Sequence, residues 1–281
     1  MKTQLAYAGR GVLNLFAMLL VVDWLPDFVI GRGLGSFGWA LLCILSVASY
    51  LAGVHWIERR RPTELLFRAG FGEVSAGFTL GIALFCTAML LLWLFGAYHP
   101  SGWGALSPLA SELLLIWLAG VIIEELLLRG FLFRLSAKLV GTWGALAITS
   151  ALDGAAHAYG RGATVGSSIA VALEAGVLLG AAYALTQRLW LPMGLHLGWK
   201  FAQGLVFGSL VSGGTAERAL IIDTLQGRAL LTGGAFGPAA SVIAVVICLA
   251  AAAYLLWRTV RLGRLEPAPW TQLAPTQHLQ R

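Results

Sequence analysis

Long apolar runs, separated by short polar segments, fill the chain from about residue 8 to residue 257. A helix needs about 20 apolar residues to cross the roughly 30 Å of hydrocarbon in a bilayer. Eight runs meet this requirement, at about residues 8–25, 34–56, 75–96, 109–133, 141–159, 166–187, 191–212 and 236–257. The pattern therefore predicts an all-α fold, a polytopic membrane helix bundle of about eight transmembrane helices.

Composition supports a membrane class, because 58% of the 281 residues are hydrophobic and only 11% are charged. A soluble domain carries about twice that share of charged residues. Tryptophans also fall near the ends of the predicted spans, where amphipathic rings meet lipid headgroups. They are Trp24, Trp56, Trp93, Trp103, Trp190 and Trp257.

The formal net charge of +6 could indicate a nucleic-acid partner, but the basic residues stand at the ends of apolar runs. We therefore expect the lipid bilayer, and no nucleic acid, as the partner of these charges. With a cytoplasmic N-terminus, the cytoplasmic segments hold Lys2, Arg10, Arg59, Arg60, Arg61, Arg68, Arg129, Arg134, Lys138, Arg188, Arg258, Arg261, Arg264 and Arg281. The opposite side holds Arg32, Arg161, Arg218 and Arg228. This asymmetry predicts that both termini are cytoplasmic, provided that the number of spans is even.

Three connecting segments have patterns of their own. Residues 57–74 open with a basic cluster, and either a short interfacial helix or a simple stop-transfer flank fits them equally well. Residues 213–235 are amphipathic enough for an external surface helix, and residues 265–281 resemble a disordered tail. Within the sixth predicted span, Gly176 and Gly180 would let a neighbouring helix approach closely.

Two adjacent carboxylates, Glu124 and Glu125, lie inside the fourth apolar run. A charged side chain at the bilayer centre costs at least about 2.5 kcal/mol on insertion scales, so a functional role is the favoured interpretation. Arg129 follows Glu125 by one helical turn, within reach of an ion pair. Glu124 points about 100° away around the helix and can face a different neighbour.

Two further polar pairs have helical i, i+4 spacing: Asp153 with His157, and His196 with Lys200. Each pair also has an interpretation without a function. A single histidine near a helix end, such as His157, is often structural, and a long side chain such as that of Lys200 can extend to the membrane interface. The presence of acids, imidazoles and a cation on three separate helices favours a site. A carboxylate beside imidazoles can activate water for hydrolysis. Alternatively, Glu124, His157 and His196 could hold a divalent metal such as zinc.

These residues resemble a known family, the CAAX prenyl endopeptidase and bacteriocin-processing family of intramembrane proteases. The resemblance rests on Glu124-Glu125-x-x-x-Arg129-Gly130, on the helix ending in His157, and on Leu191-Pro192-Met193-Gly194-Leu195-His196. It covers about residues 109–204. It divides the chain into N-terminal helices with a basic loop (1–108), a catalytic core (109–212) and a C-terminal part (213–281) with an external amphipathic segment, a last span and a tail.

The resemblance implies an intramembrane endopeptidase in which Glu124 activates a water assisted by His157. His196 and Lys200 would then stabilise the oxyanion, with Glu125 and Arg129 as supporting residues. The expected substrate is a membrane-embedded or lipidated protein or peptide, and the expected location is a bacterial inner membrane. The family's mechanism is either glutamate-based or metal-dependent.

Two positions depart from the family pattern. Asp153 stands where the family usually has Phe, and Lys200 stands where it usually has Asn. An ammonium at position 200 could donate to an oxyanion but would repel a metal cation, which favours a metal-free mechanism. For Glu124, His157 and His196 to lie at one depth, we expect residues 131–140 to run along the interface.

Three other functions fit parts of the pattern. A catalytically inactive membrane scaffold or bacteriocin immunity protein of the same fold would carry the departures at Asp153 and Lys200 as damage. A transporter or proton channel would also place acids and histidines in membrane helices, although no inverted repeat is visible. A retinal-type protein would use a late-helix lysine, for which Lys200 is the candidate.

Overall fold

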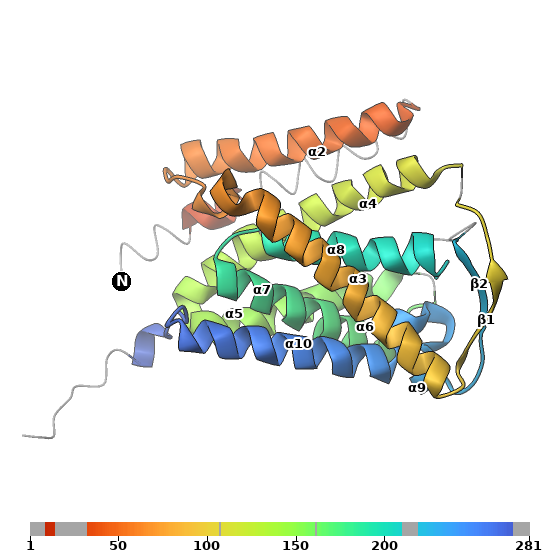
Figure 1. Cartoon of the computed structure of the whole chain (residues 1–281). Coiled ribbons are helices and arrows are strands. Elements are labelled where there is room, and N and C mark those ends of the chain that lie inside the picture. The colour runs from red at the N-terminus through yellow and green to blue at the C-terminus, as the bar shows by residue number, and fades with distance from the viewer. Residues whose placement is uncertain (1–8, 15–32, 107, 161, 210–218, 272–281) are drawn as a thin grey trace, which may run out of the picture.

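The computed structural model describes residues 9–14, 33–106, 108–160, 162–209 and 219–271. It is a bundle of helices with one small sheet at one end (Figure 1). The long helices are α2 (Gly35–Ala52), α3 (Gly70–Leu94), α4 (Ala110–Glu125), α5 (Arg134–Ala156), α7 (Val177–Thr186), α8 (Trp190–Phe201) and α10 (Val242–Arg261). Shorter elements are α6 (Val165–Val171) and α9 (Ala229–Thr232).

Several helices contain wider π-helical segments: η1 (Gly53–Ile57) after α2, η4 (Leu126–Phe133) between α4 and α5, η6 (Ala172–Gly176) between α6 and α7, and η7 (Ala202–Val206) after α8. Such segments often occur at functional sites, because the widened turn leaves backbone groups without their usual helical partners.

Every predicted span from residue 34 onward contains a helix in the structure. Four helical stretches among the described residues are long and apolar enough to cross a membrane: Gly35–Ile57, Thr63–Leu94, Val165–Thr186 and Val242–Arg261. The structure therefore supports a helical membrane bundle but does not confirm a count of eight spans. The predicted span at 8–25 lies mostly outside the described residues.

The chain between the fourth and fifth predicted spans stays helical from Ala110 through Val140 and turns back at Gly141. Gly141 has φ +77°, a left-handed conformation that favours glycine. Phe131 and Phe133 are buried against the bundle. Residues 131–140 thus extend the helix of the fourth predicted span, contrary to the expectation that they leave it, and the chain reverses after them. Arg129 and Asp153, each twelve residues from Gly141, are thereby brought together.

Helices α3 and α8 cross in direct backbone contact (Figure 1). Gly77 and Gly81 on α3 face Gly194 and Gly198 on α8, and a Cβ at any of the four would overlap a backbone atom of the other helix. Small residues four apart permit this approach in membrane helices. The predicted close approach at Gly176 and Gly180 is also confirmed, because a Cβ there would press on Ser150 and Leu146 of α5.

The fold is not purely helical. Strand β1 (Tyr98–Trp103) pairs antiparallel with β2 (Ile221–Leu225), with Tyr98 opposite Leu225, Trp103 opposite Ile221 and an irregularity between Pro100 and Gly102. The surface helix predicted for 213–235 is therefore wrong over residues 221–225. The run Ile-Ile-Asp-Thr-Leu is rich in β-branched residues, and its intermediate and exposed positions alternate as on a half-covered strand.

Two segments with patterns of their own lie at the opposite end of the bundle. Residues 63–65 and 67–69 form short 3₁₀ turns, η2 (Thr63–Leu65) and η3 (Phe67–Ala69), and α3 begins at Gly70. In the region predicted as a disordered tail, residues 265–271 pack on α5: the Thr142 N–H donates to the Glu266 carbonyl oxygen, and the Glu266 N–H donates to Thr142 Oγ1. Residues 272–281 lie outside the described part of the chain.

Candidate active site

The two glutamates at the end of α4 differ in their access to the surroundings. The Glu124 side chain is 32% exposed, whereas that of Glu125 is 0% exposed. Adjacent residues point about 100° apart on a helix, so one side chain can reach the opening while the other is buried. Only Glu124 of the two can reach a water or a substrate directly.

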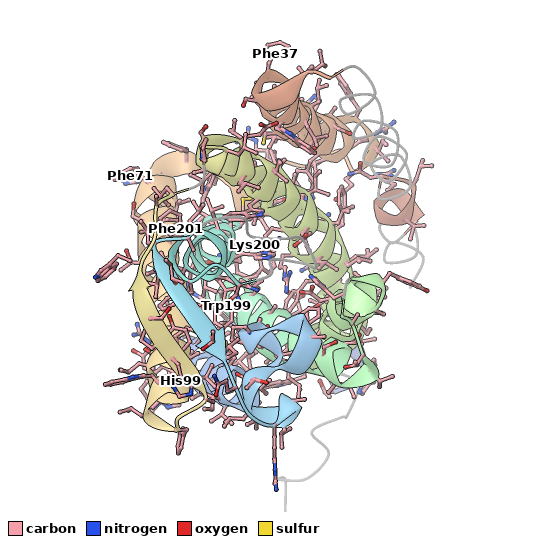
Figure 2. The ribbon with its side chains drawn as sticks, turned by 90° about the vertical axis from the view of Figure 1, so that its right-hand side faces the viewer. Phe37, Phe71, His99, Trp199, Lys200 and Phe201 are labelled. Atoms are coloured by element: carbon pink, nitrogen blue, oxygen red, sulfur yellow. The ribbon has the colours of Figure 1, made fainter. Side chains whose placement is uncertain are left out.

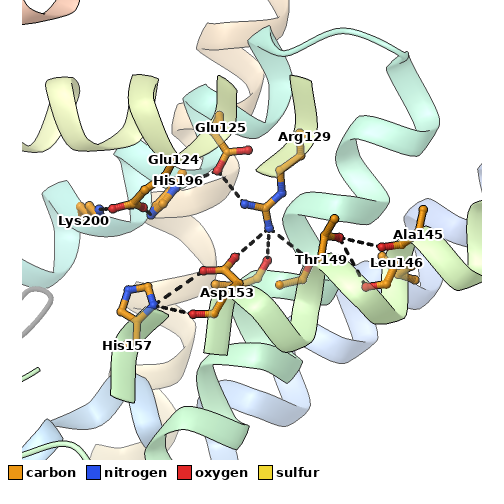
Figure 3. Close-up of polar contacts among 12 residues, drawn as sticks. Glu124, Glu125, Arg129, Ala145, Leu146, Thr149, Asp153, His157, His196 and Lys200 are labelled. Atoms are coloured by element: carbon orange, nitrogen blue, oxygen red, sulfur yellow. Dashed lines mark hydrogen bonds and ion pairs between the residues drawn. The ribbon is translucent and has the colours of Figure 1, made fainter. Parts of the chain in front are cut away.

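Glu125 belongs to a buried ionic network with Arg129 and Asp153 (Figure 3). Arg129 Nη1 donates to Glu125 Oε1 at 3.1 Å, and Nη2 donates to Asp153 Oδ2 at 2.9 Å. The Arg129 side chain is 0% exposed, so its charge depends on these two carboxylates. The predicted ion pair between Glu125 and Arg129 is present, and Asp153 completes it from a second helix.

The same guanidinium binds the backbone of a third helix. Arg129 Nη2 lies 3.3 Å from the carbonyl oxygens of Ala175 and Gly176, at the end of the π-helical segment η6. A widened turn leaves carbonyl groups that an outside donor can satisfy. Arg129 therefore ties α4, α5 and η6 together beneath the two glutamates.

His196 on α8 lies between the two glutamates (Figure 3). Its Nδ1 is 2.9 Å from Glu125 Oε1, and its Nε2 is 3.4 Å from Glu124 Oε2. One turn further along α8, Lys200 Nζ lies 3.3 Å and 3.4 Å from the two carboxylate oxygens of Glu124. Glu124 thus faces one imidazole and one ammonium, both on the helix that the α3 glycines hold in place.

Seen from the sheet end of the molecule, Lys200 and Trp199 lie towards the middle of the bundle, to one side of the strands (Figure 2). Lys200 is 6% exposed, so its ammonium is inside the protein and does not extend to the surface. The alternative in which Lys200 reaches towards an interface does not match this position.

His157 directly follows α5, and its ring lies beside Asp153 (Figure 3). Its Nδ1 is 2.9 Å from the Asp153 carbonyl oxygen and 3.7 Å from Asp153 Oδ1. Among the described residues, Glu124 makes its polar contacts with His196 and Lys200, not with His157. The assistance of Glu124 by His157 would therefore act across a gap that water can fill.

A cavity of about 60 Å³ lies next to His196 and Lys200, the two residues that contact Glu124, and extends to Asp153 and His157. Its polar lining consists of Asp153, His157, Glu174, His196, Lys200 and Gln203, and its apolar lining includes Trp199 and Phe236. One water needs about 10–15 Å³ of such volume and two or more polar partners, so the cavity can hold several waters. The site provides the volume and the polar lining that hydrolysis requires.

Glu174 is a lining residue whose role could not be anticipated from its position in the chain. Its side chain is buried, and its Oε2 has no hydrogen-bond partner among the described residues. An unpaired carboxylate buried in protein is unfavourable and takes up a proton or binds water. The signal that could have found it was a single acid inside an otherwise apolar run, a weaker signal than the two adjacent acids at Glu124 and Glu125.

The residues present do not fit a zinc centre. In the part of the chain that the structure describes, no three His, Cys, Asp or Glu side chains are grouped so as to hold a metal ion. Within the candidate set Glu124, His157 and His196, both ring nitrogens of His196 face carboxylates. In addition, the Lys200 ammonium lies against Glu124, where it would repel a bound cation.

One comparison with known proteins gives a match. Residues 106–202 match the family model described as Rce1-like, type II CAAX prenyl endopeptidase Rce1-like. This is about a third of the chain, and it contains every residue of the ionic network described above. No curated protein and no solved structure matched the chain. The match confirms the resemblance that the motifs around Glu124, His157 and His196 indicated.

Proposed function

We propose that this chain, Rce1-like over residues 106–202, is an intramembrane endopeptidase that hydrolyses a peptide bond of a membrane-associated or lipidated protein or peptide. One observation carries the proposal. Glu124 is the accessible member of a glutamate pair, and it faces His196 and Lys200, which themselves line a cavity large enough for water. The chain is an integral membrane protein by its apolar helices and its family match.

In the proposed reaction, Glu124 acts as the general base. It takes a proton from a water, and the water oxygen forms a bond to the carbonyl carbon of the scissile peptide. The carbonyl electron pair moves to oxygen, where Lys200 and His196 donate hydrogen bonds to the resulting oxyanion. When the tetrahedral intermediate collapses, the C–N bond breaks and Glu124 returns the proton to the leaving amine.

The close contact between Glu124 and Lys200 supports this assignment. A carboxylate within 3.3 Å of an ammonium is favoured in its charged form, the form that can accept a proton. The ammonium carries three donors and can turn from Glu124 to a nearby oxyanion. Lys200 would thus supply the donor that the family usually takes from Asn.

Glu125, Arg129 and Asp153 would act as positioning residues. The contact of His196 Nδ1 with Glu125 Oε1 fixes the ring so that Nε2 faces Glu124. Arg129 pairs with Glu125 through Nη1 and with Asp153 through Nη2, so that each terminal nitrogen of the buried guanidinium has a carboxylate partner. In this proposal, Asp153 supports the site and is not a sign of its decay.

The competing proposal is an inactive scaffold or immunity protein with the same fold. It predicts no peptide cleavage at all, with or without Glu124. A transporter would instead require a polar pathway through the bundle, whereas Glu124, Glu125 and Asp153 belong to one network joined by His196 and Arg129.

The test is cleavage of a library of membrane-anchored peptides by the purified, reconstituted protein. Wild type and Glu112→Gln should give the same products, because Glu112 lies at the start of α4, away from the network. Glu124→Gln should give none, and wild-type cleavage should persist with a chelator. Identical product patterns for wild type and Glu124→Gln would refute the proposal.

A further inference from the structure

A second cavity, of about 230 Å³, lies at the end of the bundle opposite the sheet. It is bordered by η2, by the region around Gly141, by the end of α7 and by the packed C-terminal segment. Its charged lining residues are Arg60, Arg61, Glu64, Arg134, Lys138 and Glu266. None of them belongs to the candidate active site.

The inner wall of this cavity is fixed by buried ion pairs. Arg60 donates through both terminal nitrogens to Glu64 at 2.8 Å and 2.6 Å, and through Nε to Glu58 at 2.8 Å. Arg134 Nη2 contacts both oxygens of Glu58, at 2.9 Å and 2.7 Å. Both glutamates are buried, so these guanidinium groups already have their counterions and give the cavity its shape.

The mouth of the cavity is different. Lys138 Nζ is 2.8 Å from Glu266 Oε1, but their side chains are 49% and 41% exposed. Exposed ion pairs of this kind contribute about 0–1 kcal/mol. Arg61 is also exposed at the mouth. An anion can therefore replace Glu266 on Lys138 at little cost to the fold.

The charges leave an excess of cations. Four basic side chains line the cavity against the carboxylates of Glu64 and Glu266, with Glu58 behind the wall. One positive charge remains, and a second becomes available when Glu266 is displaced. Basic pockets between the helices of membrane proteins bind anionic headgroups, and guanidinium and ammonium groups suit phosphate oxygens.

We propose that this cavity binds a phosphate group, with Lys138 and Arg61 as its ligands and Glu266 as the competing carboxylate. The phosphate could belong to an anionic lipid headgroup or to a free phosphate, since both present the same oxygens. The proposal is independent of peptide cleavage, because it concerns residues outside the active site and is tested by binding alone.

The experiment titrates a short-chain phosphatidylglycerol, and separately inorganic phosphate, into the full-length protein in neutral detergent. Lys138→Gln removes a ligand and should weaken binding about fivefold, whereas Glu266→Gln removes the competitor and should tighten it about fivefold. Both variants break the ion pair between Lys138 and Glu266. If that pair only stabilised the fold, both substitutions would change the affinity for the probe in the same direction. Arg258→Gln is the matched control, because Arg258 is an exposed cation on α10 outside the cavity.

Opposite shifts with phosphatidylglycerol identify a lipid site, and opposite shifts with inorganic phosphate alone identify a free-phosphate site. Both results support the proposal. No binding of either probe, shifts of Lys138→Gln and Glu266→Gln in the same direction, or an equal effect of Arg258→Gln would overturn it.

Discussion

Glu124 and Glu125 are neighbours in the chain but meet different groups. Glu125 is enclosed by Arg129 and His196, whereas Glu124 faces Lys200 and His196 and keeps an accessible carboxylate. A buried carboxylate with a guanidinium beside it is suited to hold other side chains in place. An accessible one beside an ammonium is suited to accept a proton. The division of roles follows from the 100° angle between adjacent helical positions.

Lys200 should be needed for catalysis as a donor. Lys200→Met removes both the charge and the hydrogen bonds, and we expect kcat to fall about 10²–10³-fold, the usual loss for one oxyanion donor. Lys200→Asn keeps a donor and should lose less. Initial rates on a cleaved library peptide would measure this. A Lys200→Asn variant faster than wild type would instead show that the lysine impairs the site.

Asp153 should be needed for stability. Asp153→Asn leaves the buried Arg129 charge with one carboxylate, and breaking a buried pair in this way costs about 3–5 kcal/mol. The loss would be measured as the change in the free energy of unfolding when a denaturing detergent is titrated into the protein in a mild detergent. Glu266→Gln breaks an exposed pair and should cost at most about 1 kcal/mol. Equal losses for the two variants would contradict the structural role of Asp153.

Residue spacing predicted only the local part of this network. The i, i+4 distance was enough for Glu125 with Arg129. The contact of Arg129 with Asp153 spans 24 residues and depends on the reversal at Gly141. The contact of His196 with Glu125 spans 71 residues and depends on where α8 packs. Helical periodicity carries no information about either.

At the scale of the elements, the crossing of α3 and α8 sets the position of His196 and Lys200. The spacing Gly77-x-x-x-Gly81 and Gly194-x-x-x-Gly198 was visible in the sequence, as was Gly176-x-x-x-Gly180, which alone was interpreted. Glycines four residues apart indicate that another helix can approach closely. The spacing does not name the partner helix, so the pairing had to come from the structure.

Gly81→Ala should disturb both the fold and the site. Its Cβ would overlap the Leu195 carbonyl oxygen, so α8 must move and carry His196 and Lys200 away from Glu124. We expect a lower melting temperature and at least a tenfold lower cleavage rate. Gly72→Ala on the same helix meets no atom within 4 Å and should be neutral or slightly stabilising. An unchanged Gly81→Ala would mean that the helices do not touch there.

The small sheet shows where the helical interpretation failed. Residues 221–225 were assigned to an external surface helix because the segment 213–235 is amphipathic. Their pairing with residues 98–103, more than a hundred positions earlier, decides their conformation. Long-range strand pairing overrides a weak local pattern.

At the scale of the molecule, the basic residues gather at the end opposite the sheet. Arg60, Arg134 and Lys138 line one cavity there together with Gln187, which directly follows α7 and precedes Arg188. Arg261 ends α10 at the same end of the bundle, and the strands form the other end (Figure 1). The predicted orientation places this basic end in the cytoplasm, and it stays a prediction.

Cysteine labelling in intact cells would test the orientation. In a background without Cys43, Cys86 and Cys248, a membrane-impermeant maleimide should label Thr224→Cys on the sheet but not Arg261→Cys on α10 until the cells are opened. Both positions are exposed, so access and not burial decides the result. The reverse labelling pattern would place the sheet in the cytoplasm.

The central claim is that Glu124 activates the hydrolytic water, and the cleavage rate of Glu124→Gln tests it most directly. A glutamine has the same shape but cannot accept the proton, so we expect the rate to fall at least about 10²-fold. As a control for folding, the variant must have the same size-exclusion elution volume as the wild type and show a thermal unfolding transition. A folded Glu124→Gln that cleaves the same peptide at the wild-type rate would contradict the mechanism.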